Sequence, residues 1–198
     1  MDPVHVVTGR AVPLERTDVD TDQIIPSEWL KRIERTGFGA GLFAEWRDDR
    51  DFVLNKEEHA GATILLAGRN FGTGSSREHA VWALVDYGFR AVVSPRIADI
   101  FKNNSTRSGL VPVEVDDDLA EALMAAVKAD PGLEITVDVD RRVVEAPAAG
   151  IAGPFRLDDV ARERLLKGLD DIGVTLAHAA DIDAYEARRP AWMVSLGA

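Results

Sequence analysis

The segment best suited to chemistry is a run of glycines and serines that ends in an arginine. It reads Gly72-Thr73-Gly74-Ser75-Ser76-Arg77 and follows a short apolar stretch, residues 62–67. A glycine-bearing turn between a strand and a helix leaves backbone N–H groups free to bind an anion. Arg77 stands in the expected first turn of the helix, where the helix dipole disfavours a cation, so we expect an anion opposite its side chain. The segment therefore predicts an anion site beside a serine hydroxyl.

Three better-known motifs do not fit this segment. A dinucleotide-binding GxGxxG would need glycine where Arg77 stands, and the Gly-Lys-Ser/Thr of a phosphate-binding loop is absent. A GxSxG nucleophile turn is absent too, because Ser75 has a glycine on only one side. A purely structural interpretation stays open: Ser75 and Glu78 fit the S-x-x-E capping box, in which Ser75 would cap the helix.

A second candidate is an acidic stretch near the N-terminus, Asp18-Val19-Asp20-Thr21-Asp22. Its alternating carboxylates match the start of a calcium-binding EF-hand loop, but the glycine and the distal glutamate of that loop are missing. The alternative interpretation is an ordinary exposed turn, because aspartate is common in turns. The residues alone leave both a functional and a structural role open.

The composition limits what the chain can do. Its 198 residues, 46% of them hydrophobic, suit one globular domain, and no apolar run is long enough to cross a membrane. The net charge of −11 argues against nucleic acid as a partner. The N-terminus shows no secretory pattern, so we expect a cytoplasmic protein. With no cysteine and four scattered histidines, the chain offers no metal-ligand pattern and no thiolate for an iron–sulfur cluster.

The elements around these segments alternate between strands and helices. We expect strands at 4–12, 62–67, 90–94 and 109–115 and helices at 29–35, 77–87 and 97–104. Further along we expect a helix at 119–128, a hairpin of 135–139 with 143–146, a strand at 154–157, and helices at 160–169 and 182–189. This order predicts an α/β fold with a central, mostly parallel sheet. We expect a single domain over residues 1–198, of which about 158–198 form a helical C-terminal extension.

Both candidate segments carry a family resemblance. Asp20-Thr21-Asp22-Gln23-Ile24-Ile25-Pro26 together with Gly72–Ala80 resembles the swivelling β/β/α domain of the aconitase superfamily. Within it, further stretches resemble the small subunits of bacterial 3-isopropylmalate dehydratases: Thr36–Gly39, Phe52–Asn55, Trp82–Leu84, Asp86–Phe89, Ala98–Phe101 and Gly173–Leu176. The resemblance runs from about residue 8 to residue 193, nearly the whole chain.

The resemblance implies a hydro-lyase that moves a hydroxyl between adjacent carbons, here in the interconversion of 2- and 3-isopropylmalate during leucine biosynthesis. It implies that Ser75 is the base, that Asp22 is its acidic partner, and that Arg77 supplies positive charge and binds a substrate carboxylate beside Gly74 and Ser76. The family uses one iron of a [4Fe–4S] cluster as Lewis acid. Because this chain has no cysteine, we expect the cluster on a larger partner subunit, and activity only in that heteromer.

The resemblance also places a substrate-recognition loop at residues 29–33, with Trp29, Leu30 and Ile33 as contacts. An apolar side chain near Ile33 suits an isopropyl group, where aconitase has an arginine for an additional carboxylate. The alternative interpretation is purely structural: Leu30 and Ile33 would be ordinary core residues of a helix. For the whole chain two further hypotheses stay open: a small subunit of homoaconitase or citraconate/methylmalate type, and a cluster-free anion-binding regulatory module.

Overall fold

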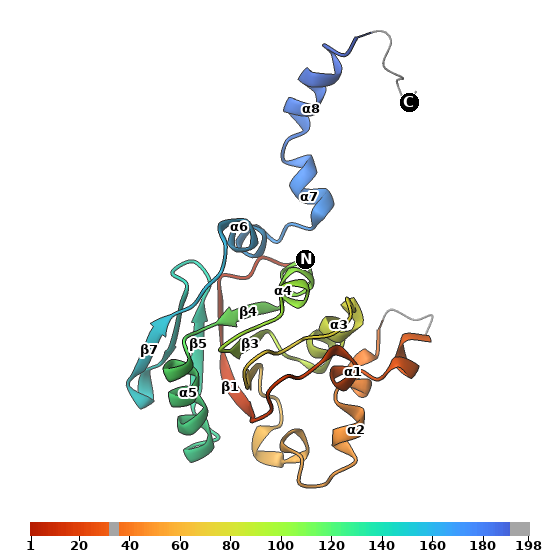
Figure 1. The fold of residues 1–198 in the computed structure, drawn as a ribbon. Helices are drawn as coiled ribbons and strands as arrows, with labels where there is room; N and C mark the ends of the chain where they lie inside the picture. The colour runs from red at the N-terminus through yellow and green to blue at the C-terminus, as the bar shows by residue number, and fades with distance from the viewer. Residues whose placement is uncertain (32–35, 191–198) are drawn as a thin grey trace.

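The computed structural model describes residues 1–31 and 36–190 and contains a mixed sheet with helices on both faces (Figure 1). Within these residues seven strands lie in the order β4-β3-β2-β1-β5-β6-β7. The strands are β1 (Val6–Leu14), β2 (Ile64–Ala67), β3 (Ala91–Ser94), β4 (Val111–Glu114), β5 (Glu134–Asp138), β6 (Val143–Ala146) and β7 (Ile151–Pro154). Strands β1 to β4 are parallel neighbours, whereas β5, β6 and β7 join antiparallel, which confirms the α/β unit over residues 62–115 and the hairpin.

The helices connect these strands and continue beyond them. The α-helices are α1 (Thr21–Ile24), α2 (Ala44–Arg47), α3 (Glu78–Tyr87), α4 (Asp99–Arg107), α5 (Asp117–Ala129), α6 (Asp159–Lys167), α7 (Asp171–Leu176) and α8 (Ala179–Glu186). Short 3-10 helices are η1 (Ser27–Lys31), η2 (Phe38–Gly41), η3 (Val53–Asn55), η4 (Glu57–His59) and η5 (Pro147–Ala149). Between residues 36 and 60 the chain thus forms only short helical turns: η2, α2, η3 and η4.

Alternation along the strands divides the interior into two cores, one on each face of the sheet. Val12 and Leu65 face the core that α3 covers with Leu84, while Ala11 and Ile64 face the other core, which α5 covers. Figure 1 shows α3 and α5 on opposite sides of the strands. Because the parallel strands are covered on both faces, β2 and β3 are buried at every position, as their continuous apolar runs predict.

The antiparallel half of the sheet curls around α5. This helix contacts β1 and β2 on one side and β7 on the other. Gly153 of β7 permits the close approach, because a Cβ atom there would lie 2.4 Å from Cδ2 of Leu119. The helix that follows the parallel unit therefore fills the concave side of the sheet and leaves the opposite face to α3 and α4.

Two expected elements lie elsewhere than predicted. The strand expected at 154–157 is Ile151–Pro154. Phe155 N still donates to Arg142 O beside β6, and Arg156 then pairs with Glu114 of β4 in an isolated bridge. The strand was placed too late because Gly153 is a residue typical of turns. The helix expected at 29–35 is the 3-10 turn Ser27–Lys31, and residues 32–35 lie outside the described part of the chain.

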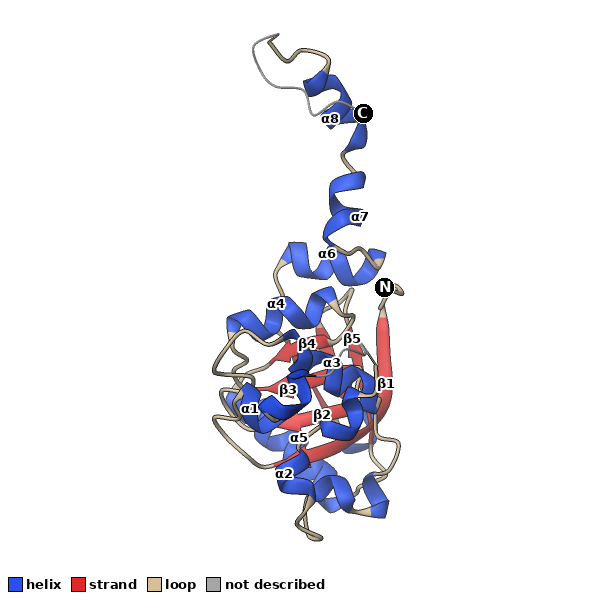
Figure 2. Cartoon of the chain, turned by 90° about the vertical axis from the view of Figure 1, so that its right-hand side faces the viewer, coloured by secondary structure: helices blue, strands red, loops and turns tan. Residues whose placement is uncertain are grey.

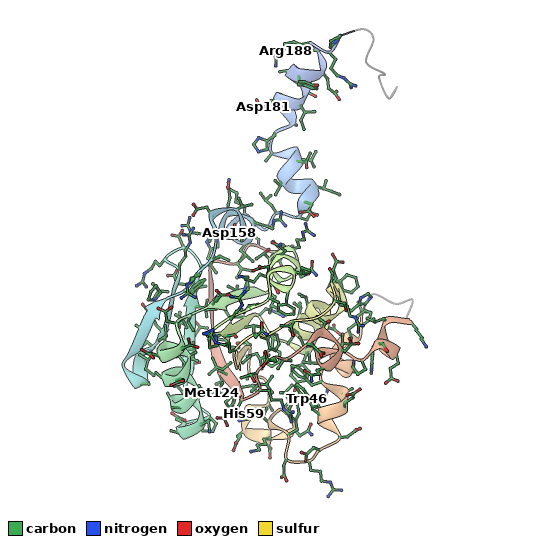
Figure 3. All side chains as sticks on the ribbon, viewed as in Figure 1. Trp46, His59, Met124, Asp158, Asp181 and Arg188 are labelled. Atoms are coloured by element: carbon green, nitrogen blue, oxygen red, sulfur yellow. The ribbon has the colours of Figure 1, made fainter. Side chains whose placement is uncertain are left out.

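The expected C-terminal extension divides into two parts. Helix α6 packs on the body, with Leu165 buried in the core, whereas α7 and α8 leave the body (Figures 1 and 2). The helix expected at 182–189 begins and ends earlier, at Ala179–Glu186, and α7 was not expected. Neither α7 nor α8 contains a buried residue. In Figure 3 Asp181 and Arg188 lie on this extension, far from Met124 and His59 in the body. No helix in residues 1–31 or 36–190 is long and apolar enough to span a membrane.

Candidate active site

The two candidate segments lie side by side, although about fifty residues separate them in the sequence. Both follow the carboxyl ends of neighbouring parallel strands, β1 and β2, which is the edge where α/β sheets bind ligands. Asp20 and Thr73 form a parallel bridge, and Thr21 N donates to Thr73 O over 2.9 Å. Gly72 N donates to Val19 O over 2.7 Å. Backbone pairing therefore fixes one segment against the other.

Thr21 joins the segments a second time, at Ser75 itself. The Thr21 side chain is buried, and its Oγ1 donates to the carbonyl oxygen of Ser75 over 3.1 Å. Ser75 is exposed, and its hydroxyl has no hydrogen-bond partner within the described residues. The arrangement holds the Ser75 backbone in place while its side chain stays open to a ligand. Sequence reasoning missed Thr21, because a threonine in an aspartate-rich stretch has the pattern of an exposed loop.

Arg77 forms an ion pair with Asp22, so the anion expected opposite the arginine is this carboxylate. The Arg77 side chain is 19% exposed and that of Asp22 is 58% exposed, which leaves the pair open on the aspartate side. A guanidinium has five N–H donors, so Arg77 retains capacity for a second carboxylate. The structure thus brings Ser75, Arg77 and Asp22 into one site.

Ser75 does not cap helix α3, so the capping interpretation is wrong. The helix begins at Glu78, its N-cap is Arg77, and no side chain caps it. Arg77 has an extended backbone, with φ −127° and ψ 104°, so the helix cannot begin earlier. Residues 72–76 therefore form a turn that precedes helix α3 and is not part of it.

Two glycines give this turn its shape. Gly72 has a φ of +77°, and a Cβ atom there would lie 2.4 Å from Cγ of Phe101. Gly74 has a φ of +91°, and a Cβ atom there would lie 3.3 Å from Oγ1 of Thr21. Both positions require a conformation that other residues adopt at a cost. Gly74 and Ser76 are exposed beside Ser75, where the sequence leads us to expect substrate contacts.

A third segment, residues 94–98, holds the other side of the turn. Phe71 N donates to Arg96 O over 3.0 Å, and Ala98 N donates to Phe71 O over 2.9 Å. The buried Ser94 hydroxyl lies 2.8 Å from both Gly68 O and Arg96 O. The turn that carries Ser75 is therefore fixed from two sides, and the sequence alone did not identify this second side.

The expected recognition loop is described only in part. Trp29 is partly buried against the core, and its ring covers Gly41, where a Cβ atom would lie 2.4 Å from Trp29 Cδ2. Leu30 is partly exposed, and η1 contains no buried residue, so Leu30 is not the core residue that the alternative interpretation requires. Ile33 lies outside the described residues. A contact of these three side chains with substrate stays a prediction.

The residues of this chain do not fit an iron–sulfur cluster. The sequence has no cysteine to supply a thiolate. In residues 1–31 and 36–190 no group of three or more His, Asp or Glu side chains is arranged to hold a metal ion.

Comparisons with known proteins give matches over nearly the whole chain. A 3-isopropylmalate dehydratase small subunit from Parafrankia sp. (strain EAN1pec) is 65% identical, and the match covers 98% of each chain. The chain belongs to the family of these small subunits. The small subunit from Rubrobacter xylanophilus is 58% identical, again over 98% of each chain. The family keeps its fold at greater distance: a crystal structure of 3-isopropylmalate dehydratase (leuD) from Methanocaldococcus jannaschii has a TM-score of 0.67 at 26% identity, covering 91% of this chain and 99% of that one.

Two family models match separate parts of the chain. The aconitase C-terminal domain matches residues 1–118, which contain the parallel strands and every member of the Ser75 site. The C-terminal domain of the 3-isopropylmalate dehydratase small subunit matches residues 171–193, which include α7 and α8. The candidate site thus lies within the match to the aconitase C-terminal domain, and α7 and α8 lie within the match to the small-subunit model.

Proposed function

We propose that this chain is the small subunit of a 3-isopropylmalate dehydratase and interconverts 2- and 3-isopropylmalate, in leucine biosynthesis, together with a larger subunit. The observation that carries the proposal is the joined set of Ser75, Arg77 and Asp22 at one edge of the sheet. The names of relatives up to 65% identical supply the substrate.

In this proposal Ser75 removes the carbon-bound proton beside a substrate carboxylate. A serine hydroxyl is a poor base unless positive charge and N–H donors stabilise its alkoxide. Arg77 is the cation of the site, and Asp22 orients its guanidinium. The exposed backbone at Gly74 and Ser76 offers further N–H donors to a carboxylate. Thr21 holds the carbonyl of Ser75, so the base keeps its position.

The larger subunit supplies what this chain lacks. When present there, a [4Fe–4S] cluster provides the Lewis acid that assists loss of the hydroxyl. The exposure of Ser75 at the edge of the molecule supports an active site shared between two subunits. A cytoplasmic location fits a chain without disulfides.

The test is an anaerobic assay of the complex, co-expressed with the candidate large subunit, for the alkene intermediate formed from 2-isopropylmalate. We expect turnover, and a loss of at least about 100-fold in kcat for Ser75→Ala, the usual scale for removing a general base. Ser108→Ala, on the far side of α4, is the matched control and keeps full activity. An inactive complex with an intact cluster contradicts the proposal.

Related acids separate the remaining alternatives. Turnover of homocitrate-type acids or citraconate, without turnover of 2-isopropylmalate, assigns the chain to another hydro-lyase of the superfamily. Function that needs no large subunit and survives Ser75→Ala indicates an anion-binding regulatory module.

A further inference from the structure

Glu114 is a mostly buried carboxylate at the end of β4, two strands away from β2. Its side chain is 14% exposed. Oε2 accepts from Ile97 N over 3.0 Å and from Lys102 Nζ over 3.2 Å, while Oε1 lies 3.5 Å from Arg156 Nη1. Burial raises the pKa of Glu114, but the Ile97 N–H and the two cations outweigh burial and hold it below the ordinary value. The carboxylate is therefore ionised at neutral pH.

The backbone that Glu114 holds is the segment that supports the turn of Ser75. Ile97 forms a parallel bridge with Phe71, which directly precedes Gly72. The next residues of the same segment lead into α4, whose Phe101 ring packs edge-on against Phe71, with ring centroids 5.3 Å apart. Glu114 thus fixes Ile97, Ile97 fixes Phe71, and Phe71 begins the turn.

Glu114 makes no direct contact with the site. No hydrogen bond or ion pair joins it to Ser75, Arg77 or Asp22, all of which are described residues. Its charge is also compensated by Lys102 and Arg156. An electrostatic effect on Ser75 is therefore small, and the path from Glu114 to Ser75 is geometric.

We propose that Glu114 is a positioning residue for Ser75, because it holds the 96–98 segment against which the turn of Ser75 is built. The proposal rests on the proposed function, in which Ser75 is the base. An error of about 1 Å in the position of a reacting group reduces turnover by up to about 100-fold. If Glu114 no longer accepts from Ile97 N, we expect Ser75 to be displaced and kcat to fall.

The test compares three variants of the small subunit in the complex with its large subunit. Glu114→Met keeps the length of the side chain but removes the acceptor, and we expect kcat to fall by about 10-fold or more with KM within about twofold. Glu114→Gln retains an oxygen for Ile97 N and restores kcat to within about threefold. Asp116→Asn is the matched control: Asp116 also pairs with Arg156 but does not contact Ile97, so kcat stays at the wild-type value.

A second measurement, amide hydrogen exchange, does not depend on enzymatic activity. In the small subunit alone, amide hydrogen exchange at residues 71–73, whose N–H groups are hydrogen-bonded, is expected to accelerate by about 10-fold or more in Glu114→Met. It is expected to stay unchanged in Asp116→Asn and in the distant strands β5 and β6. Should Glu114→Met not fold, Glu114→Asp, which is shorter by one methylene, replaces it.

The outcomes separate the two proposals. A wild-type complex that fails to convert 2-isopropylmalate contradicts the proposed function, while exchange still tests the role of Glu114. If Glu114→Met leaves both kcat and local exchange unchanged, Glu114 does not position the turn. A lower melting temperature with uniform acceleration of exchange and an unchanged kcat of the folded complex shows a merely structural role, and also overturns the proposal.

Discussion

At the scale of single residues, the site depends on groups that do no chemistry of their own. Thr21 offers one hydroxyl to the carbonyl of Ser75, out of reach of solvent. Without this donor the carbonyl of Ser75 is held less firmly, so the backbone of the turn is expected to shift. The same reasoning applies to Ser94, which bridges Gly68 O and Arg96 O.

We therefore expect Thr21→Val, which keeps the shape and removes the hydroxyl, to lower kcat of the complex by about 10-fold, with a loss of about 1 kcal/mol in unfolding free energy. Thr21→Ser keeps the donor and restores most of kcat. Steady-state kinetics and urea unfolding measure the two effects. Equal activity of the valine and serine variants would show that the hydrogen bond to Ser75 has no catalytic role.

The residues that could be predicted from the sequence are those in local motifs. Ser75 and Arg77 stand in a short segment whose composition is unusual, and Asp22 was named from the family resemblance. The structure brings the three together. Thr21, Ser94 and Glu114 have no such signal, because their roles arise only from which segments meet at the sheet edge. A glutamate at the end of a strand looks like any solvated acid until Ile97 is seen to donate to it.

At the scale of elements, the parallel strands were predictable and the irregular turns were not. Continuous apolar runs such as those of β2 and β3 indicate strands buried on both faces. The turns η2, η3 and η4 have three or four residues each, too short for a periodic pattern. The start of α3 differs from the prediction by one residue, because Arg77 has an extended backbone and is the N-cap instead of the first helical residue.

The end of β4 gives a prediction for the dependence of stability on pH. The pKa of Glu114 is lower in the folded chain than in the unfolded one, because the Ile97 N–H, Lys102 and Arg156 outweigh burial. Glu114 therefore stabilises the fold above about pH 4.3, the usual pKa of a glutamate, and this contribution disappears as the pH falls through the lower folded value.

We expect Glu114→Gln to be less stable than the wild type at pH 7, and the difference to shrink as the pH falls below about 4. Urea unfolding of the small subunit at both pH values measures it. Burial lowers the pKa of His59, so acid also destabilises the chain below about pH 6.5, but equally in both proteins, and this cancels in the difference. A difference independent of pH would mean that the charge of Glu114 does not matter.

At the scale of the whole molecule, the chain divides into a packed body that includes α6 and an extension formed by α7 and α8, neither of which contains a buried residue. Four large apolar side chains of the extension are exposed: Ile172, Leu176, Ile182 and Tyr185, between 38% and 69%. Exposed apolar groups that gather in one place often mark an interaction surface. The family model for the C-terminal domain of these small subunits matches this same stretch, residues 171–193. We propose that the body folds without the extension, and that the extension binds the large subunit.

A chain that ends at Gly168 tests both parts of this proposal. It loses the ion pairs of Asp171 with Arg107 and Arg164. Asp171 is exposed in both pairs, although the Arg164 side chain is only 15% exposed, so we expect a loss of about 1 kcal/mol for each pair and a fall of several degrees in the melting temperature. Its affinity for the large subunit, measured by analytical ultracentrifugation, is expected to fall by at least about 10-fold.

In the full-length chain, the double substitution Ile172→Ser with Leu176→Ser should also weaken association with the large subunit. Asp181→Asn with Asp183→Asn changes charge on the same extension without removing apolar surface, so it should leave association intact. Truncation that unfolds the body would show that the extension belongs to its core, and undiminished association would place the partner's contact elsewhere, next to the open edge that carries Ser75.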